Sequence, residues 1–180
     1  MIYSPAEDSF LIEKEVRKYS KNKKILDIGA GSGILSKAAK NSGAKSVLAS
    51  ELDKEAIKHL EKEGIQTIPS YLFKNIKGKF DMIIFNPPYL PLDNKEDFES
   101  RKATTGGKKG DEIILEFLKQ SKKHLMHAGL ILIVISSLTP KKRIYALLKE
   151  LKLKKEIVSS ERYFMEEIQV WKITLDIVKI

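Results

Sequence analysis

The tetrapeptide Asn86-Pro87-Pro88-Tyr89 directly follows an apolar segment, 80–85, and its residue types could carry nitrogen chemistry. The Asn86 side-chain oxygen and the Pro87 carbonyl can accept the two N–H hydrogens of an amide or aromatic amino group, which frees the nitrogen lone pair from the π system. The prolines restrict the backbone, and Tyr89 can stack on a flat substrate group. Such a nitrogen could attack an electrophilic methyl carbon without prior deprotonation. The alternative is a proline-rich turn that only closes a strand.

A glycine-rich turn upstream indicates a ligand with an adenosine part. Residues 27–33 read Asp-Ile-Gly-Ala-Gly-Ser-Gly. Glycines such as Gly29 and Gly31 let the backbone approach a ligand, and Glu51, about twenty residues on, can hydrogen-bond ribose hydroxyls. The spacing differs from the dinucleotide pattern G-x-G-x-x-G, and Asp27 suits an amino-acid ammonium better than a pyrophosphate. We therefore expect a cofactor other than NAD, with a turn that binds nothing as the alternative.

Composition limits the classes of protein and of site. The 180 residues, 42% of them hydrophobic, suffice for one sizeable core. The chain has no cysteine, and its three histidines are scattered, so we expect neither disulfides nor a metal centre. No apolar run approaches roughly 20 residues and no signal-peptide pattern starts the chain, which predicts a soluble, cytoplasmic protein without a membrane partner. The formal charge of +9 fits an acidic partner such as RNA, but also a lysine-rich surface adapted to heat.

Apolar segments alternate with helical patterns, which predicts a doubly wound α/β fold. We expect strands at 24–28, 46–50, 65–68, 80–85 and 130–135, and helices at 34–41, 54–63 and 111–127. Thr139 is expected to cap a last helix that has Pro140 at its first position and ends near Leu151. Alternation at period two over 156–162 and 168–177 predicts an antiparallel pair. The long segment 86–110 is expected to be a functional loop.

The sequence resembles the HemK-related glutamine methyltransferases over nearly its whole length. The likeness is greatest to the short archaeal and eukaryotic branch that modifies the Gly-Gly-Gln loop of class I translation release factors. Residues 3–11, Tyr-Ser-Pro-Ala-Glu-Asp-Ser-Phe-Leu, are similar to the branch's Tyr-x-Pro-Ala-Glu-Asp-Thr/Ser-Phe-Leu start, which lies over the cofactor in the family. Residues 105–110, Thr-Gly-Gly-Lys-Lys-Gly, resemble its Gly-Gly-x-x-Gly loop near the substrate entrance.

This resemblance implies a Rossmann-like class I methyltransferase fold in one domain over 1–180. The expected sheet has seven mostly parallel strands and an antiparallel C-terminal strand, with an N-terminal helical segment, 1–20, over the cofactor site. The implied cofactor is S-adenosylmethionine, which leaves as S-adenosylhomocysteine after transfer. Among the residues, Asp27 and Gly29 would hold the methionine moiety, and Glu51, in place of the commoner aspartate, would hold the ribose. Gly31 is also expected to bind the cofactor.

Further residues acquire roles by the same resemblance. Ser9, in the segment that lies over the cofactor in the family, keeps the hydroxyl of the usual threonine and would bind the cofactor. Asn86 would hold the reacting group beside Pro87, Pro88 and Tyr89. Tyr71 stands where the family usually has an aspartate that contacts the adenine amino group. At Tyr71 and the following Leu72, that contact must come from the backbone or be missing.

Four functions follow from these features. Methylation of a glutamine side-chain amide in a release factor is favoured, and methylation of an exocyclic amino group in DNA or RNA uses the same chemistry. Lysine methylation fits poorly, because an amine needs deprotonation rather than a localised lone pair, and a noncatalytic cofactor-binding scaffold has no need of Asn86 and Tyr89. Because the N-terminal helical domain of bacterial HemK-type enzymes is lacking, the resemblance also implies a small zinc-binding activator subunit as a partner.

Overall fold

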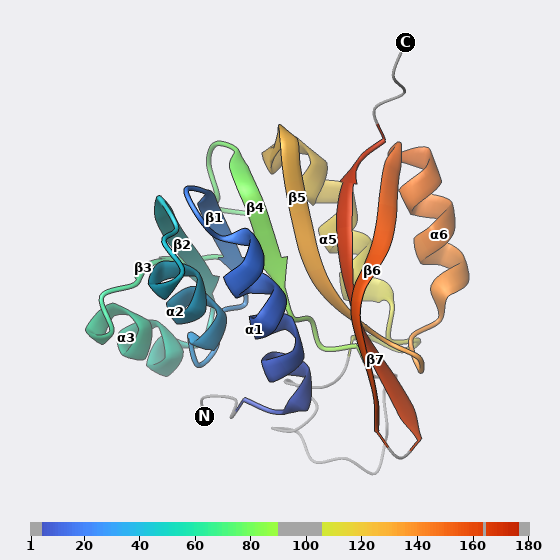
Figure 1. Ribbon diagram of the computed structural model, residues 1–180, viewed down its shortest axis with the longest axis horizontal. Helices are drawn as coiled ribbons and strands as arrows, with labels where there is room; N and C mark the ends of the chain where they lie inside the picture. Colours follow the sequence, from blue (N-terminus) through green and yellow to red (C-terminus); the bar gives the residue numbers. More distant parts are fainter. Residues whose placement is uncertain (1–4, 90–105, 164, 177–180) are drawn as a thin grey trace.

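The computed structural model describes residues 5–89, 106–163 and 165–176 (Figure 1). The helices of this part are α1 Glu7–Tyr19, α2 Ile34–Asn41, α3 Lys54–Lys62, α5 Glu112–His124 and α6 Lys141–Glu150. The strands are β1 Lys24–Ile28, β2 Ser46–Glu51, β3 Gln66–Pro69, β4 Phe80–Phe85, β5 Leu125–Ser136, β6 Leu153–Tyr163 and β7 Glu166–Leu175. Tyr3 and Ser4 of the N-terminal motif, and 90–105 of the expected functional loop, lie outside the described residues.

Within the described residues, the strands form one seven-stranded sheet in the order β3-β2-β1-β4-β5-β7-β6. The pairs from β3 to β5 are parallel, whereas β7 runs antiparallel to both of its neighbours. The predicted fold, a mostly parallel sheet with an antiparallel C-terminal strand, is thereby confirmed. The chain order reverses between β1 and β4, and ligands of open α/β sheets bind in the crevice at the carboxyl ends of such strands.

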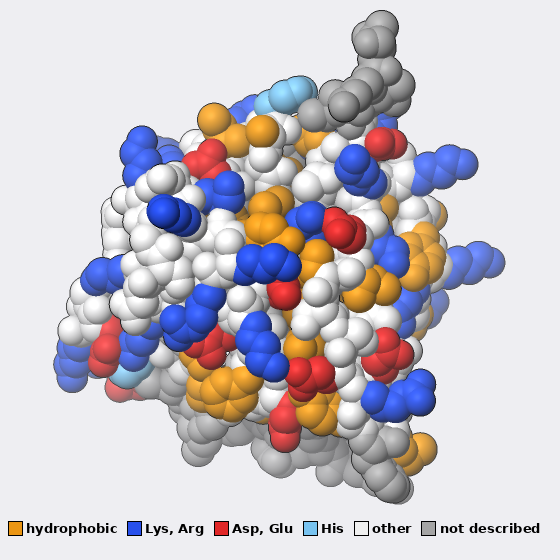
Figure 2. Space-filling model, viewed as in Figure 1, with side chains coloured by type: hydrophobic (Ala, Val, Ile, Leu, Met, Phe, Trp, Pro, Cys, Tyr) orange, Lys and Arg blue, Asp and Glu red, His pale blue; other side chains and the backbone are white. Residues whose placement is uncertain are grey.

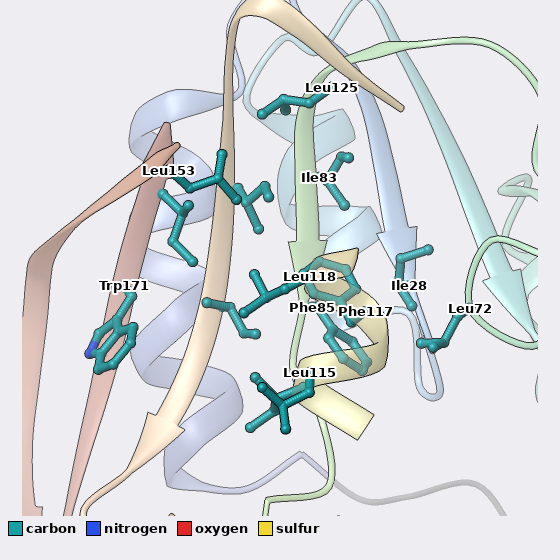
Figure 3. Close-up of a cluster of buried hydrophobic side chains, with 14 of the residues drawn as sticks. Ile28, Leu72, Ile83, Phe85, Leu115, Phe117, Leu118, Leu125, Leu153 and Trp171 are labelled. Carbon is teal, nitrogen blue, oxygen red and sulfur yellow. The ribbon is translucent and has the colours of Figure 1, made fainter. Parts of the chain in front are cut away.

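Helices cover both faces of this sheet (Figure 1). The helices α1, α2 and α3 lie on one face, and α5 and α6 on the other. Neighbouring residues of a strand point to opposite faces, so Ile84 packs in the cluster under α1 and α2, while Phe85 packs on the α5 side. Figure 3 shows Phe117 and Leu118 of α5 in that second cluster, with the rings of Phe85 and Phe117 4.5 Å apart. Packing on both faces fixes the carboxyl ends of the central strands.

The largest difference from the expected boundaries lies between α5 and β5. The helix predicted over 111–127 ends at His124, because Leu125 already pairs with Phe80 and begins β5. The pairing shifts register after Phe80, and a Cβ on Gly129 would lie 2.8 Å from the Leu125 side chain. Residues 125–127, predicted as the end of the helix, therefore form the irregular start of β5, and Gly129 is required there because a side chain would collide with Leu125.

The predicted cap of α6 is also wrong. Pro140, not Thr139, occupies the N-cap position, and no side chain caps this helix. The Thr139 hydroxyl instead donates to the Tyr89 carbonyl oxygen at 3.2 Å. By contrast, α3 has a side-chain cap, since Asp53 accepts hydrogen bonds from the backbone of Glu55 and Ala56.

Charged side chains of both signs cover the face shown in Figure 2. Lysine and arginine side chains are spread over this face rather than gathered in a single stripe, and hydrophobic side chains reach the surface between them. In the part of the chain that the structure describes, no helix has the length and apolar character needed to cross a membrane.

Candidate functional site

The predicted site residues converge at the carboxyl ends of β1, β2 and β4. In the sheet register, Ile28 pairs with Ser50 on one side and with Phe85 on the other. The glycine-rich turn, Glu51 and Asn86 therefore begin at the same level of the sheet. The first turn of α1 joins them, because Asp8 and Ser9 contact Asn86 across 78 and 77 residues of sequence.

The glycine-rich turn has a shape that requires glycine. Gly29, Gly31 and Gly33 have φ angles of 64°, 51° and 77°, in the left-handed region that other residues rarely adopt. The backbone N–H of Gly29 donates to the Ser50 carbonyl at 2.8 Å and ties the turn to β2. A Cβ on Gly33 would lie 2.6 Å from the Leu60 side chain, so this glycine also permits close packing of α3. The turn can therefore present backbone close to a ligand.

Glu51 braces this turn from the end of β2. One carboxylate oxygen accepts from the Gly31 N–H at 2.8 Å. The other accepts from the backbone N–H groups of Leu52 and Asp53, at 2.6 Å and 3.0 Å. Three backbone donors thus hold a half-buried carboxylate at the turn, where the sequence predicts a ribose contact. A carboxylate has about four lone-pair sites, so one more acceptor position is available to a hydroxyl.

The carboxyl of Asp27 points toward α2. Its side chain is 1% exposed and accepts a hydrogen bond from the Ser36 hydroxyl at 2.7 Å. The pKa of Asp27 is raised to about 7, mainly by burial and in part by the nearby Glu51 carboxylate, while hydrogen bonds from Ser36 act in the opposite direction. Asp27 therefore fastens β1 to the first turn of α2, and its predicted contact with a cofactor ammonium stays a prediction.

The Asn86 side chain has one amide end bound and the other end available. Its Nδ2 donates to Asp8 Oδ2 at 3.2 Å and to Ser9 Oγ at 3.4 Å. Its Oδ1 is buried and has no hydrogen-bond partner among the described residues. A buried carbonyl without a partner is costly and uncommon in folded proteins. This arrangement suits an acceptor that is completed by the N–H group of a ligand.

Asp8 is the residue that sequence reasoning missed. Its side chain is buried, and Oδ2 also accepts from the Tyr89 hydroxyl at 3.3 Å. The backbone and hydroxyl of Ser9 donate to Oδ1 at 2.6 Å and 3.1 Å. The only signal in the sequence was a carboxylate next to Ser9, inside the segment that the resemblance places over the cofactor. The structure thus brings Ser9, Asn86 and Tyr89 together around one carboxylate.

The glycine segment after the loop returns to the tetrapeptide. A Cβ on Gly106 would lie 2.6 Å from the Pro88 carbonyl oxygen and 2.5 Å from that of Gly110. Gly107, with a φ of 115°, packs against the Glu112 side chain of α5. Only glycine permits this approach, so the described part of the predicted Gly-Gly-x-x-Gly loop lies beside the predicted substrate site. Thr105 lies outside the described residues.

Tyr71 and Leu72 follow β3 beside Glu51, whose carbonyl accepts from the Ser70 N–H at 3.0 Å. The Tyr71 hydroxyl donates to Glu116 Oε2 of α5 at 2.9 Å. Partial burial and the Glu116 carboxylate raise the pKa of Tyr71. Leu72 directs its side chain into the core and has a φ of 46° (Figure 3). A cofactor contact at Leu72 would therefore have to come from its backbone.

Comparison with known proteins gives a consistent set of relatives. The model of the family described as Methyltransferase small domain matches residues 8–165. A Methanocaldococcus jannaschii protein, provisionally named a protein N5-glutamine methyltransferase, is 38% identical over 177 residues, which cover 94% of this chain and 89% of the relative. The release factor glutamine methyltransferase of Borreliella burgdorferi is 38% identical over 125 residues, covering 62% of this chain and 44% of that protein.

The fold has a counterpart among solved structures. The structure of the E. cuniculi Mtq2–Trm112 complex, described as responsible for methylation of the eRF1 translation termination factor, superposes with a TM-score of 0.79. The match covers 96% of this chain and 98% of that chain, at 22% sequence identity. At this identity the likeness establishes a shared fold.

Proposed function

The chain belongs to the Methyltransferase small domain family, whose members use S-adenosylmethionine, and on this premise we propose that it methylates the side-chain amide nitrogen of a glutamine in a translation release factor. The observation that carries the proposal is the Asn86 Oδ1 atom, buried and without a partner among the described residues. A primary amide brings N–H donors that this oxygen can accept. The names of two relatives, one for protein N5-glutamine and one for release factor glutamine methylation, support the substrate.

The described residues fit the cofactor. We propose that the turn at Gly29 and Gly31 and the Glu51 carboxylate hold S-adenosylmethionine, with Ser9, Asp27 and the 71–72 segment beside it. When bound, S-adenosylmethionine supplies an activated methyl group. The protein's part is to accept the amide hydrogens at Asn86 Oδ1 and the Pro87 carbonyl, so that the nitrogen lone pair is free to form the new bond. Tyr89 flanks the flat amide, and the surplus proton leaves for water after transfer.

Within the release factor, we propose the Gly-Gly-Gln motif as the target, as the resemblance to the short HemK-related branch implies. Two glycines before the glutamine have no side chains, so the backbone of such a loop can approach a confined site. A release factor acts at the ribosome, so this proposed substrate supports a cytoplasmic location for the enzyme.

We also propose a small zinc-binding activator subunit as a partner. The fold counterpart was solved as a complex with a second protein, Trm112, which supports this proposal. Leu52, directly after β2, and Met165, between β6 and β7, are exposed large hydrophobic residues near the carboxyl-end edge of the parallel strands, where a partner could cover them. The chain expressed alone is expected to be poorly soluble and to be rescued by co-expression of the activator. High solubility and full activity of the chain alone would contradict this expectation.

The second candidate function is methylation of an exocyclic amino group in nucleic acid. The same two acceptors serve such a nitrogen, and the net charge of +9 permits a nucleic-acid substrate. The deciding experiment measures labelled methyl transfer from S-adenosylmethionine to the release factor, its Gly-Gly-Gln→Gly-Gly-Ala variant, total RNA and DNA, with and without the activator. Label on the release factor that disappears in the variant supports the proposal, and label on nucleic acid alone replaces the substrate.

A further inference from the structure

The Asp8 carboxylate connects α1 with two residues of the proposed catalytic tetrapeptide. Asp8 Oδ2 lies 3.2 Å from Asn86 Nδ2 and 3.3 Å from the Tyr89 hydroxyl oxygen. The other oxygen, Oδ1, accepts two hydrogen bonds from Ser9. Asp8 is only 7% exposed although it lies in the first turn of a helix. Both oxygens of the Asp8 carboxylate are therefore fixed by hydrogen bonds, so the carboxylate has little freedom to rotate.

The chemistry of this contact selects one orientation of the Asn86 amide. The terminal torsion of asparagine is broad and roughly two-fold, so its oxygen and nitrogen can exchange places at little cost when neighbours permit. A carboxylate offers only acceptors, and an amide nitrogen offers only donors. With Asp8 on one side, Nδ2 must face the carboxylate and Oδ1 must face away from it. The unpartnered state of Oδ1 follows from this constraint.

We propose that Asp8 is the positioning residue of the methyl-transfer site. It orients the Asn86 amide so that Oδ1, and not Nδ2, faces the substrate nitrogen, and it holds the Tyr89 hydroxyl at the same time. The expected effect of Asp8 on the rate of methyl transfer rests on the proposed function. The orientation of the Asn86 amide does not depend on it. Asp8 contributes by fixing the orientation of the Asn86 amide, since the oxygen that accepts the substrate N–H belongs to Asn86.

The orientation can be tested without any substrate. In a ¹⁵N–¹H spectrum of the whole chain, the Asn86 side-chain amide is identified by its loss in Asn86→Asp. We expect its two proton resonances to lie well apart, because one proton is bound by Asp8, and to converge in Asp8→Ala. The exposed neighbour on the same helix turn provides the control, Glu7→Ala, which leaves the signal unchanged. An Asn86 signal that is the same in Asp8→Ala and in the wild type would overturn the proposal.

The kinetic test separates positioning from simple structural support. Asp8→Ala is expected to lower kcat by about 10- to 100-fold, while KM and cofactor affinity change by less than about threefold, because a displaced acceptor costs transition-state stabilisation. Adding Asp8→Ala to Asn86→Ala is expected to lower the rate by less than about threefold more, since the effect through Asn86 Oδ1 is already lost and only the contact with Tyr89 remains. Independent losses that multiply in the double variant would contradict a role through Asn86.

A nearly isosteric variant keeps the test decisive if Asp8→Ala unfolds. Asp8→Asn conserves volume but offers a donor as well as an acceptor, so it permits the reversed Asn86 amide and is expected to lower kcat by about tenfold. Wild-type kcat in Asp8→Asn together with an unchanged amide signal would refute positioning by Asp8. If the wild-type chain transfers no methyl to the release factor, the proposed function fails, whereas the amide signal still decides the role of Asp8.

Discussion

The proposed site has two halves, a cofactor half around Asp27 and Glu51 and an acceptor half around Asp8 and Asn86, and their polar groups are hydrogen-bonded in different ways. In the cofactor half, Glu51 accepts three backbone N–H groups and Asp27 accepts hydrogen bonds from Ser36, so both carboxylates help to hold the protein itself. In the acceptor half, Asp8 occupies one end of the Asn86 amide and the other end stays without a partner among the described residues. Hydrogen bonds within the protein thus shape the proposed cofactor half, whereas we propose that a ligand completes the acceptor half. Substitutions in the two halves should therefore change different quantities.

The largest effect is expected in the acceptor half. Asn86→Ala removes the oriented acceptor and should lower methyl transfer by about 100-fold or more, while cofactor affinity stays within about tenfold. Single-turnover transfer and calorimetric binding of S-adenosylmethionine measure the two quantities. Asn41→Ala, at the exposed end of α2, is the control. Unchanged turnover in Asn86→Ala would remove Asn86 from its assigned role.

In the cofactor half, Glu51→Gln should mainly weaken binding. A glutamine amide nitrogen would face backbone N–H groups that now donate to a carboxylate oxygen, so the turn loses part of its support. Losing a hydrogen bond to a charged group costs about 1.5–3 kcal/mol, which corresponds to roughly 10- to 100-fold in cofactor affinity. The rate at saturating cofactor should change little. A kcat that falls as far as in Asn86→Ala, with affinity intact, would abolish the distinction between the two halves.

The pH dependence of stability should report on Asp27. Its pKa is raised in the folded protein, from an ordinary value of 3.8 to about 7, so the folded state binds the proton more tightly than the unfolded state. Stability from this group therefore falls as the pH rises between these two values. In Asp27→Asn this fall should disappear from the free energy of unfolding, measured by urea denaturation at several pH values. Parallel pH curves for the variant and the wild type would contradict the raised pKa.

The smallest effect is expected at Tyr71. Tyr71→Phe removes a hydrogen bond to the Glu116 carboxylate from a residue that is 42% exposed, and because solvent screens this bond its contribution should be only about 0.5–1.5 kcal/mol. Cofactor affinity should change by no more than about tenfold, and kcat should stay the same. A larger loss of affinity would show that the hydroxyl contacts the cofactor directly, in place of the aspartate usual in the family.

Local signals in the sequence predicted the order of the elements and the strand ends at which the candidate site residues lie. The apolar strand 80–85 and the glycine-rich turn at 27–33 depend on periodicity and on backbone conformations that glycine permits, and both are visible within a few residues. The sheet then aligns the ends of its strands, which brings Glu51 and Asn86 together as expected.

Contacts between distant parts of the chain were not predictable in the same way. Thr139 has the residue type of a helix cap, but the Tyr89 carbonyl, 50 residues away, takes its hydroxyl. Asp8 and Asn86 are 78 residues apart, and no local pattern shows that one carboxylate restricts the other side chain. The Asp27 carboxyl accepts a hydrogen bond from Ser36 of α2, which no local pattern indicated, and its contact with the cofactor stays a prediction. In each case the tertiary structure supplies the hydrogen-bond partner.

The most direct test of the account locates the methyl group. The release factor, incubated with the chain, its activator and S-adenosylmethionine, is digested and its peptides are analysed by fragmentation mass spectrometry. One added methyl group is expected on the glutamine side chain of the Gly-Gly-Gln peptide, and Asn86→Ala is expected to form this product at least about 100-fold more slowly than the wild type. A methyl group on a lysine, or none on the release factor while nucleic acid becomes methylated, would contradict it.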